Sequence, residues 1–125
     1  MRIGNVGIFV KDLEAARKFF EQYFDAKVLA EYNEEKNHYY SYIMGFAEGC
    51  KLELMTKPEI VDQPKDKNRT GYAHLSMKVD TAEQLYALID SWKELGYEIL
   101  YEPATTGGKE VRAVAFEDNV FEVSY

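Results

Sequence analysis

Four polar side chains in this sequence are of types that bind metal ions, and they form two pairs with the same spacing. Asn5 and His74 are 69 positions apart, and Glu53 and Glu122 are also 69 apart (74 − 5 and 122 − 53). Imidazole nitrogens and carboxylate or amide oxygens are common ligands of divalent metal ions. A repeated architecture with one polar residue at each equivalent point would bring the four together, so the spacing suggests a metal site.

The four residues differ in how well they suit a metal. Glu53, His74 and Glu122 supply two carboxylates and one imidazole, an oxygen-rich set that suits Mn, Fe, Ni or Zn. Asn5 is a neutral and weaker donor, which would either offer its carbonyl oxygen or hold a metal-bound water. The simpler alternative is that His74 is a structural histidine and that both glutamates lie on the solvent face of a sheet, since each stands between two apolar residues.

Both halves of the chain contain the same predicted order of elements, a strand, an amphipathic helix and three further strands. Helical periodicity follows Asp12, a predicted N-cap, and also follows the capping-box pair Thr81 and Gln84. The predicted helices begin at Leu13 and Ala82, again 69 apart. The predicted strands are residues 2–10, 27–31, 39–46 and 51–56 in the first half, and 72–79, 97–101, 111–116 and 120–125 in the second.

The repeated βαβββ order predicts an α+β fold built from two modules. We expect a single domain over residues 1–125, with one module at 1–56, a connection at 57–71 and a second module at 72–125. The chain is long enough for one domain with a substantial core. The connection contains two prolines and few large apolar residues, and loops of this length are often lids or binding loops.

Composition restricts the classes of partner. A formal net charge of −7 argues against nucleic acid and against anionic membrane surfaces. The sequence has a single cysteine, Cys50, which excludes an internal disulfide, and it has neither a leader-like segment nor a long apolar run. We therefore expect a cytoplasmic protein that binds a small molecule.

Two further groups of residues are open to either a binding role or a structural one. An aromatic pocket or ordinary strand packing would account for the tyrosines that follow His38, namely Tyr39, Tyr40 and Tyr42. Contact with an anionic substrate or simple solvation would account for two cations in the connection, Lys67 and Arg69.

Several short segments carry a family resemblance that covers nearly the whole chain. They are VGIFVKDLE at 6–14 with the following Phe19 and Phe20, LELM at 52–55, AHLSM at 73–77, FEDN at 116–119 and FEV at 121–123. In these segments the sequence resembles the vicinal oxygen chelate superfamily. That group includes glyoxalase I, bleomycin-resistance proteins, fosfomycin-resistance enzymes, methylmalonyl-CoA epimerase and extradiol dioxygenases. The resemblance is closest to small bacterial-type glyoxalase I proteins, and it implies two βαβββ modules that form a curved mixed sheet around a cavity.

The resemblance also implies a site and an activity. The four metal positions of the family read His, Glu, His and Glu, and they fall here on Asn5, Glu53, His74 and Glu122, so that only Asn5 departs. The implied enzyme is a lactoylglutathione lyase-like metalloenzyme with a divalent ion (Ni, Zn, Mn or Fe). It would act by proton transfer through a metal-stabilised enediolate on an oxygen-chelating substrate such as a thiol hemithioacetal. The implied roles are Glu122 as base, Glu53 as second carboxylate and His74 as fixed ligand.

Other functions within the superfamily stay open. A non-catalytic protein that binds an antibiotic-type small molecule, as bleomycin-resistance proteins do, is favoured by Asn5 and by the tyrosine-rich strand. An epimerase-type enzyme is a further option. Dioxygenase and fosfomycin-type chemistry are disfavoured, because they would place a second histidine at position 5. Modules pair across a homodimer in several members, so Glu53 and Glu122 need not come from the same chain.

Overall fold

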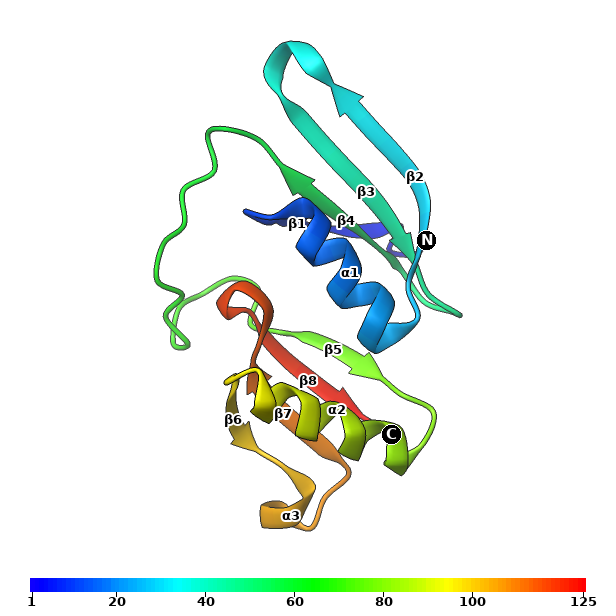
Figure 1. Cartoon of the computed structure of the whole chain (residues 1–125), viewed down its shortest axis with the longest axis vertical. Helices are drawn as coiled ribbons and strands as arrows, with labels where there is room; N and C mark the ends of the chain where they lie inside the picture. The colour runs from blue at the N-terminus through cyan, green and yellow to red at the C-terminus, as the bar shows by residue number, and fades with distance from the viewer. The chain divides into compact units, whose positions relative to one another are not determined.

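The computed structural model describes residues 1–125 and divides the chain into two compact units, Met1–Gln63 and Pro64–Tyr125. Each unit contains one βαβββ module (Figure 1). The first module consists of β1 (Asn5–Phe9), α1 (Leu13–Phe24), β2 (Lys27–Glu34), β3 (Tyr39–Gly45) and β4 (Lys51–Thr56). Its sheet has the order β1-β4-β3-β2, in which β1 and β4 are parallel and the other neighbours are antiparallel.

The second module repeats this topology. It consists of β5 (Leu75–Lys78), α2 (Ala82–Glu94), β6 (Glu98–Tyr101), the short α3 (Pro103–Thr106), β7 (Glu110–Val114) and β8 (Val120–Ser124). The strand order is β5-β8-β7-β6, with β5 parallel to β8 and the other neighbours antiparallel. The predicted α+β fold with two βαβββ modules is therefore confirmed, as two mixed sheets of which neither is closed.

Local signals start both long helices where they were predicted. The Asp12 side chain accepts a hydrogen bond from the backbone N–H of Ala15, at 2.9 Å. Thr81 and Gln84 form a full capping box, in which each side chain accepts from the backbone of the other residue. These caps satisfy N–H groups that have no partner within the helix, so the helix starts are determined locally.

One face of each sheet is covered by the helix of its own module (Figure 1). Apolar residues fill the space between helix and sheet, and alternation along the strands supplies them. In the first module the buried residues are Val10, Ala16, Phe19, Phe20, Ala26, Met44, Leu52 and Leu54. In the second they are Leu85, Leu88, Ile89, Trp92, Val111, Ala113, Phe121 and Val123, among others. The opposite face of each sheet carries no helix of its own module, and we call it the helix-free face.

The two modules have the same strand register, including the position of one β-bulge. Glu53 pairs with Ile43 on β3, and Glu122 pairs with Arg112 on β7, so both partners are again 69 apart. The outer strand of each module contains a β-bulge at the matching point of the register. It lies between Val28 and Ala30 in β2, and between Ile99 and Tyr101 in β6. A shared bulge is much more specific than a shared order of elements, because bulges interrupt a ladder at one residue.

The observed elements differ from the predicted ones mainly at their ends; β1, for example, begins at Asn5 instead of residue 2. The strand predicted at 72–79 begins only at Leu75, so His74 lies immediately before β5 instead of within it. β2 continues to Glu34, three residues beyond its predicted end. The helix α3 was not predicted, although Pro103 opens it and Gly107 ends it with a positive φ of 73°. None of the helices has the length and apolar character needed to span a membrane.

Candidate functional site

The four predicted site residues lie at matching places in the two modules. Asn5 is the first residue of β1 and Glu53 lies in β4, while His74 directly precedes β5 and Glu122 lies in β8. Glu53 pairs with the residue two positions after Asn5, and Glu122 pairs with the residue two positions after His74. The first module therefore places its pair on two adjacent parallel strands, and the second places Glu122 on β8 and His74 immediately before the parallel neighbour, β5.

The glutamates lie on the helix-free faces because of strand alternation. Leu52 and Leu54 are buried against α1, so Glu53 between them points to the other face. The same alternation separates Glu122 from the buried Phe121 and Val123. Both glutamates are half-buried, whereas Asn5 and His74 are exposed.

The structure brings together pairs of these residues but not all four. No group of three or more His, Cys, Asp or Glu side chains forms a cluster that could hold a metal ion. Asn5 and Glu53 belong to the first unit, and His74 and Glu122 belong to the second. The predicted set of four therefore depends on a contribution from both units.

Three of the four side chains have unused hydrogen-bonding capacity. Asn5, Glu53 and His74 make no side-chain hydrogen bond or ion pair with the rest of the chain. The polar neighbours of Glu53 on adjacent strands are also few, because it pairs with Ile43 on one side and Gly7 on the other. These three side chains are thus free to bind a ligand.

Glu122 has partners that the sequence did not reveal. Arg112 Nη1 donates to Glu122 Oε2 at 3.5 Å, and the Tyr101 hydroxyl lies 3.4 Å from the same oxygen. Both distances are at the upper limit for a hydrogen bond. The Tyr101 hydroxyl makes a shorter bond, 3.1 Å, to Glu110 Oε1. The second oxygen of Glu122, Oε1, accepts no hydrogen bond.

The environment of Tyr101 keeps its hydroxyl protonated. Its pKa is raised above the ordinary value, first by burial and then by the hydrogen bond to Glu110. Tyr101 is therefore a hydrogen-bond donor at neutral pH. Neither Tyr101 nor Arg112 was predicted to belong to the site, and the available signal was weak: Arg112 stands ten positions before Glu122, as cross-strand partners in a tight antiparallel pair can.

Both helix-free faces are hollowed. The hollow of the first module has a cavity volume of about 430 Å³. Its lining residues are Gly4, Asn5, Leu29, Ala30, Tyr32, Ile43 and Lys51. The hollow of the second module, about 440 Å³, is lined by Tyr101, Thr106, Gly108, Lys109, Glu110 and Ser124. A predicted metal position, Asn5, therefore borders a cavity that is otherwise mainly apolar.

The other candidate residues have partners near them. The Tyr40 hydroxyl donates to Glu35 at 3.0 Å, and the Tyr42 hydroxyl donates to Glu14. These contacts favour the structural explanation of the two tyrosines, and Tyr32 lines the hollow instead. Lys67 lies 3.7 Å from Glu98, and Arg69 donates to the carbonyl of Thr70 at 3.3 Å.

Solved structures of other proteins have the same fold. A trypanothione-dependent glyoxalase I from Leishmania major is 19% identical, with a TM-score of 0.74, and the match covers 99% of this chain and 86% of that protein. A glyoxalase family protein from Bacillus cereus is 17% identical, with a TM-score of 0.77, and the match covers 99% and 93%. The fosfomycin resistance protein FosX from Listeria monocytogenes, solved with Mn(II) and a sulfate ion, is 17% identical, with a TM-score of 0.68 and coverage of 97% and 88%. No curated protein matches the chain.

A sequence model of one family accounts for nearly the whole chain. It is described as the Glyoxalase/Bleomycin resistance protein/Dioxygenase superfamily, and it matches residues 2–122. This chain belongs to the Glyoxalase/Bleomycin resistance protein/Dioxygenase superfamily.

Proposed function

We propose that this protein is a metal-dependent lyase or isomerase of the glyoxalase I type. Its substrate would be a small molecule with two adjacent oxygens, such as a thiol hemithioacetal. One observation carries the proposal: Glu53 and Glu122 stand at equivalent register positions on the helix-free faces of the two modules, while Asn5, Glu53 and His74 have no side-chain partner in the chain. The glyoxalase I of Leishmania major supports it as a relative in fold.

The donors fit a divalent metal ion. Glu53 and Glu122 would bind through carboxylate oxygens, His74 through an imidazole nitrogen and Asn5 through its amide oxygen, and this mixture suits Ni, Zn, Mn or Fe. FosX, which has the same fold, was solved with Mn(II). When bound, such an ion would act as a Lewis acid on the adjacent oxygens of the substrate.

The carboxylates would carry out the proton transfer. We assign the base to Glu122, because its Oε1 is free to accept a carbon-bound proton and to return it to the neighbouring carbon. In the structure, the Tyr101 hydroxyl and Arg112 Nη1 lie 3.4 and 3.5 Å from the other oxygen, Oε2. Glu53 would serve as the second carboxylate and as a ligand.

The proposal includes a cytoplasmic homodimer with the whole of residues 1–125 as one domain. Each copy would contribute the pair Asn5 and Glu53 to one site and the pair His74 and Glu122 to another. Light scattering after size-exclusion chromatography measures the oligomeric state directly. A monomer that binds metal would restrict the site to one chain.

Non-catalytic binding of a small molecule is the second candidate. Two observations favour it: an amide occupies the position of the first family ligand, and the hollow beside that amide is mainly apolar, with Leu29, Ala30, Tyr32 and Ile43 in its lining. Such a protein would bind an aromatic or apolar compound without metal.

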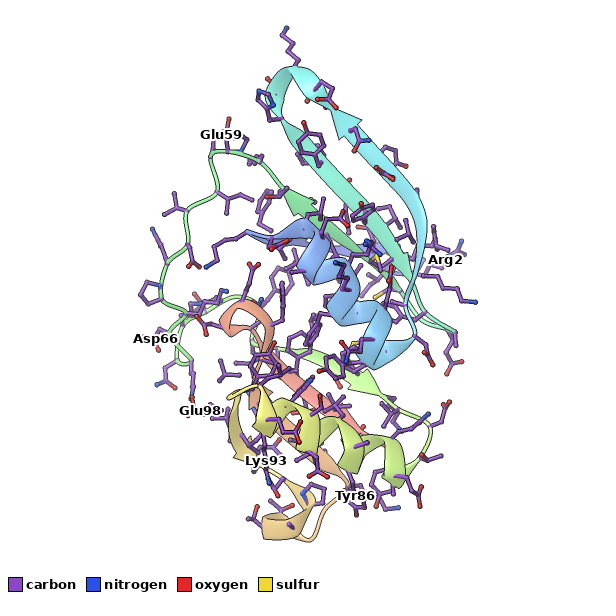
Figure 2. The ribbon with its side chains drawn as sticks, viewed as in Figure 1. Arg2, Glu59, Asp66, Tyr86, Lys93 and Glu98 are labelled. Atoms are coloured by element: carbon purple, nitrogen blue, oxygen red, sulfur yellow. The ribbon has the colours of Figure 1, made fainter.

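Thermal melting after chelator treatment tests the metal site. Addition of Ni, Mn, Zn or Fe should raise the melting temperature, since a ligand at a hundred times its Kd stabilises the folded state by about 2.7 kcal/mol. Glu53→Gln should lose most of this shift. Glu59→Gln is the matched control, because Glu59 lies on the connection after β4 and carries the same charge (Figure 2). An assay of hemithioacetal isomerisation follows. Absence of both metal content and a melting shift would rule out the metalloenzyme.

A further inference from the structure

Arg112 occupies the middle of the helix-free face of the second module. The strand order β5-β8-β7-β6 makes β7 an inner strand, and Arg112 pairs with Glu122 on one side and with Tyr101 on the other. Alternation along β7 buries Val111 and Ala113 against the helix, which leaves Arg112 on the face that carries Glu122. A cation therefore stands next to a predicted metal ligand and the proposed base.

The guanidinium group is only partly used by the protein. Its contact with Glu122 involves Nη1 alone, at 3.5 Å, and the Arg112 side chain is 31% exposed. A full pairing between Arg and a carboxylate has two parallel N–H···O bonds of about 2.7–2.9 Å. The Arg112 guanidinium therefore lies on the helix-free face without a bidentate pairing to a carboxylate of the protein.

Two carboxylates lie near Arg112, and each has another partner, observed for Glu110 and proposed for Glu122. Glu110 accepts the hydrogen bond of Tyr101 at 3.1 Å. Glu122 would be neutralised by a metal ion in the proposed function, on which this inference rests, and Arg112 would then be available to another anion. Tyr101 lies beside Arg112 as its partner on β6, and its single hydroxyl proton is donated to Glu110.

We propose that Arg112 binds an oxyanion of the substrate. A carboxylate fits best, because its two coplanar oxygens match the fork of a guanidinium. The substrate would then be a derivative of a small hydroxy or oxo acid. We expect only one anion-binding arginine of this kind per chain, because the position that matches Arg112 in the first module is Ile43.

The test compares lactate with lactamide, a neutral molecule of nearly the same shape. Binding to the full-length protein is followed by calorimetry and thermal melting, with metal and after chelator treatment. Lactate should bind at least roughly tenfold more tightly than lactamide, because a hydrogen bond between two charged groups is stronger than one to a neutral amide. Arg112→Gln should remove this preference, and Arg112→Lys should keep part of it.

Two further comparisons exclude a general charge effect. Lys93→Gln removes the same charge from the same unit, at a side chain on α2 that pairs with Glu102 at 2.7 Å, and it should leave the preference unchanged. 1-Hydroxyethylphosphonate replaces the carboxylate of lactate by a phosphonate. Tighter binding than lactate, with the same dependence on Arg112, would support the oxyanion site and identify a phosphonate as its preferred occupant.

The outcomes separate this inference from the proposed function. If the protein takes up metal but lactate and lactamide bind equally, the Arg112 assignment is wrong and the metal site stands. If no metal binds, the proposed function fails and this inference fails with it, because Glu122 then keeps its contact with Arg112. A lower melting temperature of Arg112→Gln with an unchanged preference would make Arg112 a structural ion-pair residue and overturn the proposal.

Discussion

The helix-free faces of the two modules share a backbone and differ in chemistry. At matching register positions, Glu53 has Ile43 and Gly7 as strand neighbours, whereas Glu122 has Arg112 and Ser76. Two residues further along the same parallel strands, the first module has the apolar Phe9 and Met55, whereas the second has the polar Lys78 and Ser124. The first face is mainly apolar around one carboxylate, and the second is mainly polar.

The glycine at position 7 has a specific role in the apolar face. A Cβ atom added there would lie 2.8 Å from the terminal methyl carbon of Met55, so the absence of a side chain lets Met55 lie across β1. The second module has serine at both matching positions, Ser76 and Ser124. The comparison teaches that the repeat preserves where side chains point, while the two faces have diverged in what they can bind.

The largest expected difference between the modules concerns the helix-covered faces of their sheets, and it is a difference in the free energy of unfolding. Trp92 is fully buried, with Phe121 at 5.8 Å and Tyr97 at 5.9 Å between ring centroids. Its counterpart 69 positions earlier, Tyr23, is only half-buried. Trp92→Ala should therefore lower the free energy of unfolding by about 3–5 kcal/mol, and Tyr23→Ala by roughly half as much. Urea unfolding measures both values, with Trp92→Phe as a milder control. Equal costs would contradict the asymmetry of the cores.

The pair Asn5 and His74 gives the next largest effect, on metal affinity. His74→Asn should weaken binding by more than roughly tenfold, since even groups that only orient ligands change affinity by about 10–100-fold. Asn5→His should strengthen binding by a similar factor, because imidazole is a better donor than an amide. Competition with a chromophoric chelator measures both.

The chain offers a matched control for these histidine exchanges. His38, the other histidine, has a positive φ of 50°, a conformation that asparagine adopts readily, so His38→Asn should fold normally. It should bind metal as the unaltered protein does. A gain in affinity on Asn5→His that also appears in a protein lacking His74 would argue against a shared site.

The smallest expected effect concerns a polar contact that only the first module has. The Tyr42 hydroxyl, and then Arg17, lower the pKa of Glu14 by hydrogen bonding to its carboxylate. A lowered pKa stabilises the folded state above the ordinary value near 4.5, and this contribution is lost as the pH falls. Because Glu14 is largely exposed, we expect no more than about 0.5 kcal/mol.

Acid titration of stability checks this prediction. Glu14→Gln should show a shallower loss of stability between about pH 5 and pH 3 than the unaltered protein. The matching residue in the second module is Glu83, which makes no contact of this kind, so Glu83→Gln should leave the slope unchanged. Identical slopes for all three proteins would show that the contact contributes nothing to stability.

Local signals made much of this structure predictable from sequence. β4 was predicted with its observed bounds, and both helix starts were predicted from capping residues. The start of β5 was not, because it is determined by pairing with β8 at Leu75 and Phe121, which are far apart in sequence. Arg112 and Tyr101 were missed for a related reason, since a cross-strand register cannot be read from one strand alone.

The bulge in β6 has a consequence for how this protein could change over evolution. Because the ladder skips Leu100, Tyr101 pairs with Arg112 on the helix-free face. If β6 lost the bulge while keeping its length, simple alternation would pair Leu100 with Arg112 and turn Tyr101 toward the helix. Gain or loss of a bulge in an edge strand can therefore exchange a binding residue for a core residue at that position. Descendants of one duplicated ancestor could acquire new ligands by this route while their inner strands stayed constant.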